Sequence, residues 1–356
     1  MPPVCRPGDR VAIVSPSWPV PAHYPALHQQ AMDRLRGEFG LVPVEFPTTR
    51  SGGTPEERAR DLMAAFTDPE IRAVMATIGG DDQITVLPHL DVSAVAVDPK
   101  PFVGYSDNTN LLNWLWHAGI GAWHGGSTQV HLSGLAPDPV HLASLPTALF
   151  GGRTLITPLP ASRDFGISWD DPRSLTEPAV DEPTPEGWTW VDCHEAVAGL
   201  TWGGNLEVLQ WILGVGAHVR APAAYEGCIL LLETSEEHPP AAEARRMMTV
   251  LGERGLLAQV AAVVAARPVA HERADDPGVT ARRAYREAQR DVILAAVARY
   301  APGIPVVVGV EFGHTSPQYV LPYGGHLTLD PRLGALVVDN GPETAPGRLQ
   351  EGMPCA

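Results

Sequence analysis

Short apolar segments alternate with longer amphipathic segments through the first third of the chain. The apolar segments have the length, and the bounding glycines and prolines, that are typical of buried strands. The expected strands are residues 10–15, 41–46, 71–78 and 101–104, and the expected helices are residues 28–39, 54–66 and 108–117. Because strands that alternate with helices build βαβ units, this pattern predicts an α/β domain with a mainly parallel sheet.

One of these helices has a clear start signal. Thr54 is a good N-cap residue, Pro55 suits the first helical position, and Glu57 completes a capping box. The signal predicts a helix that begins at Pro55 and ends near Phe66.

The second half of the chain has an alternation of its own. Strands are expected at residues 227–233, 260–265 and 305–310, a closing hairpin at 327–329 and 335–338, and helices at 240–254 and 280–300. Between the halves, the periodicity disappears from about residue 160 to 187, and proline and acidic residues dominate. Loops of this length are uncommon without a function, so we expect an interdomain connection or a cover over a site.

The pattern therefore predicts two α/β domains. The first spans residues 1–160, residues 161–187 form the connecting loop, and the second domain spans residues 188–356. A chain of 356 residues suits two domains of ordinary size.

The chain is acidic, with 25 Lys and Arg against 41 Asp and Glu, for a net charge of −16. Nucleic acids and anionic membranes bind basic surfaces, so neither is an expected partner. The one lysine, Lys100, is not part of a Gly-Lys-Ser/Thr motif, which excludes a P-loop. No apolar run approaches the ~18 residues of a membrane span, and no signal peptide is recognised, so we expect a cytoplasmic protein.

The four cysteines are far apart and form no C-x-x-C pair. They are Cys5, Cys193, Cys228 and Cys355. We expect reduced thiols and neither a disulfide framework nor a zinc site. The histidines show no metal-ligand spacing, and the first strand is not followed by the glycine-rich motif of a dinucleotide fold.

The strongest chemical signal is Ser106, in the sequence FVGYSDN at residues 102–108. A strand runs into a sharp turn with Ser106 at its apex, and a helix follows at once. A serine in this position is exposed beside backbone N–H groups that can hold an oxyanion. The G-x-S part matches a nucleophile elbow, although Asn108 replaces the second glycine. Ser-Asp-Asn is also a good capping sequence, so a purely structural role is the alternative.

A nucleophilic serine needs a base, and the base needs an orienting carboxylate. Glu233 ends the apolar strand GCILLLE, and His314 follows the apolar strand PVVVGV. Because ligands gather at the carboxyl ends of strands in α/β proteins, both residues are candidates for these roles. Ordinary strand-end and turn residues are the alternative, since His89, His124 and His326 also lie near strand ends.

Two glycine turns follow other predicted strands. Gly79 and Gly80 end the strand at residues 71–78, and residues 201–205 open a helix at Asn205. The backbone at such turns can approach a substrate closely and donate N–H groups, or the turns can be merely tight connections.

Together these segments resemble the LD-carboxypeptidase and microcin C immunity family of serine peptidases. The resemblance rests on GDRVAIVSPS, DPEIRAVMATIGG, PKPFVGYSDNTNLLNW, GLTWGGNLEVLQWILG, GCILLLETSEE and GVEFGHT, in this order along nearly the whole chain. It implies an N-terminal flavodoxin-like domain that carries the serine and a C-terminal β-rich α/β domain that supplies Glu and His, with the active site between them. It also implies a homodimer that needs no metal or organic cofactor.

The resemblance assigns roles to individual residues. It implies that Ser106 is the nucleophile, His314 the general base and acid, and Glu233 the carboxylate that orients His314. It also implies an oxyanion hole made by backbone N–H groups of the Gly79-Gly80 turn and of Asp107. The reaction it implies is hydrolysis of an amide bond.

Two substrate classes follow from the resemblance, a small peptide or an aminoacyl nucleotide. The LD-carboxypeptidases remove D-alanine from murein tetrapeptides, and the immunity-type members cleave the amide between an aminoacyl group and a nucleotide. The chain length and the loop at residues 160–187 favour the immunity branch. Glu236 and Glu237 would repel an aspartyl group, which favours a different aminoacyl group.

Three residues are expected to bind the substrate in this branch: Asn205, Trp188 and Trp190. A tryptophan stacked on a nucleobase contributes about 1–3 kcal/mol. Packing in the core is the alternative for Trp188 and Trp190.

Two other classes of protein remain open from the sequence. A non-catalytic protein with two α/β domains could close on a nucleotide or a sugar. A glutamine-amidotransferase-like enzyme would need a cysteine at the elbow, where this chain has Ser106.

Overall fold

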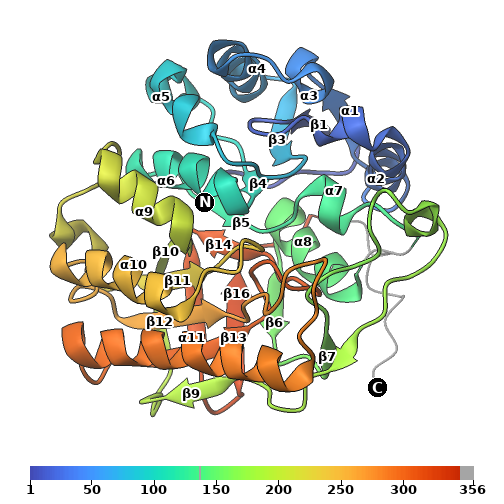
Figure 1. Cartoon of the computed structure of the whole chain (residues 1–356). Coiled ribbons are helices and arrows are strands. Elements are labelled where there is room, and N and C mark those ends of the chain that lie inside the picture. The colour runs from blue at the N-terminus through green and yellow to red at the C-terminus, as the bar shows by residue number, and fades with distance from the viewer. Residues whose placement is uncertain (136–137, 345–356) are drawn as a thin grey trace.

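Two α/β domains, each built on one sheet, make up the computed structural model, which describes residues 1–135 and 138–344. Figure 1 shows the N-terminal elements above the C-terminal ones. A small third sheet pairs β7 (Ala161–Ser162) with β8 (Glu182–Pro183). None of the helices in the described ranges is both long and apolar enough to cross a bilayer.

The N-terminal sheet has six strands in the order β14-β5-β4-β3-β1-β2. Strands β1 to β5 are parallel, and β14 pairs antiparallel with β5. The parallel order 2-1-3-4-5 is that of flavodoxin-like folds. The strands are β1 (Arg10–Val14), β2 (Val42–Glu45), β3 (Ile71–Ala76), β4 (Phe102–Gly104), β5 (Ala122–His124) and β14 (Leu321–Tyr323).

Helices cover both faces of this sheet. Successive residues of β1 point to opposite faces, so Val11 and Ile13 pack with α2, while Ala12 and Val14 pack with α4. Burial on both faces explains why the strand is apolar throughout. The helices are α1 (Val20–His23), α2 (Pro25–Gly37), α3 (Pro47–Ser51), α4 (Pro55–Thr67), α5 (Val92–Val95), α6 (Thr109–His117), α7 (Thr128–His131) and α8 (Pro139–Phe150).

The C-terminal sheet has eight strands in the order β6-β16-β15-β10-β11-β12-β13-β9. Strands β10 to β13 are parallel, and antiparallel strands flank them. The strands are β6 (Arg153–Ile156), β9 (Thr189–Val191), β10 (Val197–Asn205), β11 (Ile229–Glu233), β12 (Ala262–Ala266), β13 (Val306–Val310), β15 (His326–Asp330) and β16 (Ala335–Asp339).

Three helices pack with the parallel strands of this second sheet, and short 3-10 turns occur in both domains. The helices are α9 (Leu206–Val215), α10 (Ala241–Glu253) and α11 (Val279–Tyr300). The 3-10 turns are η1 (Gln83–Thr85), η2 (Leu87–His89), η3 (Ser106–Asn108), η4 (Pro172–Leu175) and η5 (Pro222–Tyr225).

Two strands cross the domain boundaries expected from the sequence. Strand β6 precedes residue 160 but pairs with β16 in the C-terminal sheet. Strand β14 lies within residues 188–356 but pairs with β5 in the N-terminal sheet. Each half of the chain therefore contributes one strand to the other half's sheet, which ties the two domains together.

Several local expectations can be compared with the structure directly. The capping box at α4 is confirmed: Glu57 N donates to Thr54 Oγ1 at 3.3 Å, and Thr54 N donates to the Glu57 carboxylate at 2.9 Å. The hairpin of β15 and β16 is present. Cys5, Cys193 and Cys228 are free thiols, and Cys355 lies outside the described residues.

Candidate active site

Ser106 lies where β4 turns into the helical segment formed by η3 and α6. Its φ of +62° is in the left-handed region, where a residue with a side chain is strained. A strained turn of this kind is the geometry of a nucleophile elbow. No side chain caps the start of η3 or of α6, so capping does not explain Ser106.

Buried polar contacts hold this turn in place. The Asp107 carboxylate accepts hydrogen bonds from Ser17 Oγ at 2.7 Å and from Gln83 N at 3.0 Å. The Asn108 side chain donates to the backbone oxygen of Ile78 at 3.1 Å. These contacts join the turn after β4 to the turns after β1 and β3, and so fix Ser106 relative to both.

His314 and Glu233 form a hydrogen-bonded pair. Glu233 is the last residue of β11, and His314 follows the end of β13. His314 Nδ1 lies 2.5 Å from Glu233 Oε2, and the two side chains are 7% and 0% exposed. The close approach needs Gly313, where a Cβ would lie 2.9 Å from Glu233 Cβ. The carboxylate fixes the proton on Nδ1 and leaves Nε2 as the second functional nitrogen.

Glu236 contacts that second nitrogen. Its Oε2 lies 3.2 Å from His314 Nε2. Burial lowers the pKa of His314, but the negative charges of Glu233 and Glu236 outweigh it and raise that pKa from 6.5 to about 9. Burial alone would raise the pKa of Glu233, but the charge of His314 lowers it. The pair is therefore an imidazolium and a carboxylate at neutral pH.

Buried groups form a wall behind Glu233. Asn205 lies opposite Glu233 in the pairing of β10 with β11 and is 1% exposed. Its side-chain oxygen caps α9 by accepting a hydrogen bond from Val208 N at 2.9 Å. His124 Nε2 lies 3.8 Å from Glu233 Oε1, and burial lowers the pKa of His124 to about 4. Asn205, expected to bind substrate, is not among the residues that line the cavity beside Ser106.

Gly79 and Gly80 form the turn after β3 and lie against Ser106 and Ser17. A Cβ on Gly79 would lie 2.8 Å from Ser106 Cβ, and a Cβ on Gly80 would lie 2.5 Å from Ser17 Cβ. Only glycine allows this approach. Among the described residues, the two glycine N–H groups donate to no protein acceptor. At the start of η3, the N–H of Asp107 has no acceptor within its own helix.

These groups border one cavity of about 880 Å³. It lies at the carboxyl ends of β1, β3 and β4 in the first sheet and of β11, β12 and β13 in the second. Ser106, His314, Gly79 and Gly80 line it, together with much of segment 163–170 from the predicted connection. The cavity therefore lies between the domains, at the strand ends where α/β proteins bind ligands.

The tryptophans that line the cavity are not those expected from the sequence. The Trp188 indole donates to Glu311 Oε2 at 2.8 Å, and Trp190 packs beside it with ring centroids 6.1 Å apart. Neither lines the cavity, whereas Trp18 and Trp169 do. Trp188 and Trp190 therefore follow the alternative, packing within the C-terminal domain. Trp18 could have been proposed as a cavity residue from its position just after the first predicted strand. Trp169 could not, because the segment around it has no periodicity.

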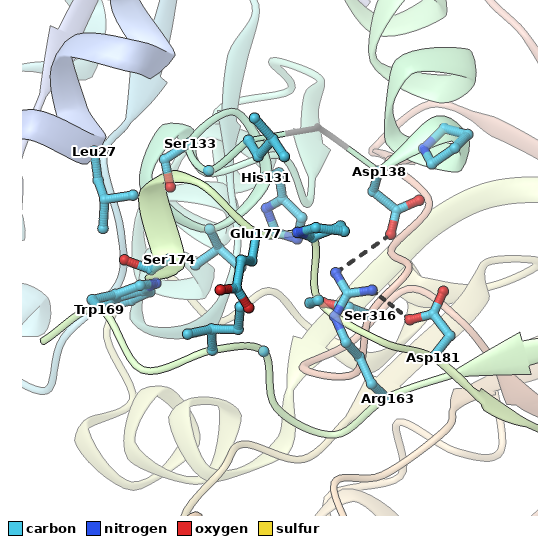
Figure 2. A pocket seen from close by; sticks show the side chains of 18 residues that line it. Leu27, His131, Ser133, Asp138, Arg163, Trp169, Ser174, Glu177, Asp181 and Ser316 are labelled. Carbon is cyan, nitrogen blue, oxygen red and sulfur yellow. Dashed lines mark hydrogen bonds and ion pairs between the residues drawn. The ribbon is translucent and has the colours of Figure 1, made fainter. Parts of the chain in front are cut away.

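A smaller chamber of about 210 Å³ adjoins the cavity and shares Arg163 and Trp169 with it. Figure 2 shows Arg163 between two carboxylates, with Asp138 at 3.9 Å and Asp181 in direct contact. Burial raises the pKa of Asp138 to about 6. The pair with Asp138 joins segment 161–187 to the start of α8, and the pair with Asp181 lies within that segment.

Two family models match this chain. The model of the LD-carboxypeptidase N-terminal domain matches residues 11–125, which include Ser106. The model of the LD-carboxypeptidase C-terminal domain matches residues 198–329, which include Glu233 and His314.

Individual proteins are similar over most of their length. A Vibrio cholerae protein named as a carboxypeptidase is 28% identical over 332 residues, 91% of this chain and 92% of the relative. The microcin C7 self-immunity protein MccF of Escherichia coli is 29% identical over 292 residues, 78% and 76% of the two chains. A structure of MccF in complex with glutamyl sulfamoyl guanosine has a TM-score of 0.78 at 23% identity, and the match covers 96% of this chain and 98% of the MccF chain. The chain therefore belongs to the LD-carboxypeptidase family of serine peptidases.

Proposed function

We propose that this protein is a cytoplasmic, homodimeric hydrolase that cleaves an amide bond through a triad of Ser106, His314 and Glu233. One observation carries the proposal. A serine on a strained turn and a histidine bonded to a buried carboxylate border the same cavity, although they come from different domains. That combination supplies a nucleophile, a base and an orienting group.

The geometry supports the following steps. Ser106 Oγ attacks the substrate carbonyl while His314 Nε2 takes the hydroxyl proton, and Glu233 stabilises the imidazolium that forms. The N–H groups of Gly80 and Asp107 hold the negative oxygen of the tetrahedral intermediate. His314 then gives the proton to the leaving amine, and water releases the acyl group from Ser106. The Glu236 carboxylate must move away from Nε2 before the first step.

We propose an aminoacyl nucleotide as the substrate. The complex of MccF with an aminoacyl sulfamoyl nucleoside supports this class. In this chain, Trp18 and Trp169 in the cavity wall offer aromatic surfaces for a nucleobase. A murein tetrapeptide is the second candidate, because the matching domain models are those of LD-carboxypeptidases.

A hydrolysis assay read by mass spectrometry separates the two substrates. The purified enzyme is given a murein tetrapeptide and a panel of aminoacyl sulfamoyl adenosines, with Ser106→Ala as the blank. Release of the nucleoside amine supports the proposal. Release of D-alanine alone identifies a wall-recycling carboxypeptidase, and no Ser106-dependent release from either substrate contradicts both.

The pH dependence of hydrolysis should reflect the raised pKa of His314. A base must be neutral, and the neutral fraction of a group with a pKa of about 9 increases as pH rises through that value. We therefore expect kcat/KM to increase from about pH 6 and level off above about pH 9. A profile that is already flat at neutral pH would contradict the ion-paired His314.

Gly79→Ala should reduce activity with little change in stability. The added methyl group would lie 2.9 Å from Ser106 Oγ and would displace the nucleophile. We expect kcat/KM to fall by about 10²-fold or more, the size of effect seen when an oxyanion donor is lost. Gly37→Ala is the matched control, because its Cβ meets nothing within 4 Å and its φ is not positive. Equal activity of the two variants would show that the Gly79 turn is only a connection.

A further inference from the structure

The active-site cavity carries more negative charge than its own arginines neutralise. Four carboxylates in its wall make no ion pair within the described residues: Asp81, Asp170, Glu237 and Glu272. Of the two arginines in the wall, Arg163 is already paired with Asp181 and Asp138. The other, Arg273, lies over the Phe165 ring at 4.6 Å and makes no ion pair within the described residues, although, against the burial that lowers its pKa, the charge of Glu236 acts to raise it. Uncompensated carboxylates in the wall attract a cationic group.

Glu236 is the cavity carboxylate that contacts the catalytic pair. Its only ion-pair partner in the described chain is His314 Nε2, at 3.2 Å, and its side chain is 59% exposed. The base of its loop is fixed, since Ser235 N and Oγ both donate to Glu207 Oε1, at 2.9 and 2.8 Å. A fixed backbone and an exposed side chain allow the carboxylate to move without the loop.

The contact between Glu236 and His314 conflicts with catalysis. The Nε2 nitrogen must be free to accept a proton from Ser106, but here the Glu236 carboxylate lies 3.2 Å from it in an ion pair. A positive group on the substrate would give Glu236 another partner and release Nε2. A neutral side chain would offer nothing in exchange beyond the α-ammonium group that every aminoacyl substrate carries, and an acidic side chain would be repelled.

We propose that Glu236 selects substrates whose acyl residue has a positively charged side chain, and that binding of this charge draws Glu236 away from His314. The charge is an ammonium or a guanidinium group. This inference rests on the proposed function and names the acyl class for the same site. Glu236 lies beside Nε2, where the scissile carbonyl must bind, so the recognised charge belongs to the acyl residue next to that bond.

Binding measurements test this charge preference separately from turnover. Lysyl, norleucyl and glutamyl sulfamoyl adenosine are titrated calorimetrically into Ser106→Ala, which retains the cavity but cannot react. Lysyl and norleucyl side chains have nearly the same shape and differ in charge. We expect the lysyl compound to bind about tenfold tighter than the norleucyl compound, and the glutamyl compound to bind most weakly.

Second-site variants in the Ser106→Ala background assign the preference to Glu236. Glu236→Gln should reduce the ratio of the lysyl to the norleucyl binding affinity about fivefold or more. Glu236→Lys should bind the glutamyl compound more tightly than the lysyl compound. The matched control is Glu226→Gln, an exposed glutamate outside the cavity, which should leave the ratio unchanged.

Three outcomes would overturn the inference: equal binding of the lysyl and norleucyl compounds, no binding of the lysyl compound, or a ratio that Glu236→Gln does not change. The active enzyme is then assayed on the same compounds. Failure to hydrolyse a lysyl compound that binds tightly would contradict the proposed function and leave the charge preference standing.

Discussion

Ser106→Ala should reduce kcat/KM by about 10⁴-fold or more, because the nucleophile of the covalent step is lost. The variant should still fold, since the Ser106 hydroxyl makes no hydrogen bond to the rest of the described chain. Steady-state kinetics and a thermal melt measure the two effects. Any activity that remains comes from the oxyanion donors and from substrate binding.

A surface variant of the same kind controls for this result. Ser51 is exposed at the end of α3 and is not among the residues that line the cavity, so Ser51→Ala should leave kcat/KM unchanged. Activity of Ser106→Ala above a tenth of the unmodified enzyme would remove Ser106 from the mechanism.

Glu233→Gln should have the second-largest effect, about 10⁴-fold on kcat. Glutamine has the same shape, but its amide can donate to Nδ1 and so favour the tautomer with the proton on Nε2. His314 could not then accept the proton of Ser106. The change also removes a charge that raises the pKa of His314, so the pH profile should shift to lower pH.

Glu207→Gln is the matched control for the Glu233 variant. Glu207 is also a buried glutamate, and its pKa is raised to about 7 by burial and by the charge of Glu233, but it binds Ser235 and not His314. We expect a much smaller loss of kcat for this variant. Similar losses in the two variants would mean that general disruption of the buried wall, and not the tautomer of His314, causes the effect.

The local parts of the fold could be predicted from the sequence because local physics determines them. The capping box at Thr54 and the alternation of apolar strands with helices are signals within a few residues of each other. The same pattern placed Ser106, Glu233 and His314 at strand ends. Parallel strands present their carboxyl ends at one edge of their sheet, and Ser106 and His314 do line one cavity at such ends. The pairing of Glu233 with His314 depends on contacts that this pattern does not show.

The features that depend on distant pairing could not be predicted in this way. Nothing in the residues of β14 indicates that it pairs with β5, about two hundred positions earlier in the sequence. Trp188 carries a polar N–H that a buried Glu311 satisfies, and the sequence does not reveal that partner. The contact of Glu236 with His314 depends likewise on how the loop after β11 lies against the loop after β13.

The proposed mechanism requires Ser106 to be an activated nucleophile. The most direct test is to incubate the enzyme with a fluorophosphonate, which a serine attacks at phosphorus with loss of fluoride, and to map the adduct by peptide mass spectrometry. We expect a single adduct on Ser106, none in Ser106→Ala, and slower labelling in Glu233→Gln. No adduct on the folded enzyme, or an adduct on another serine, would contradict it.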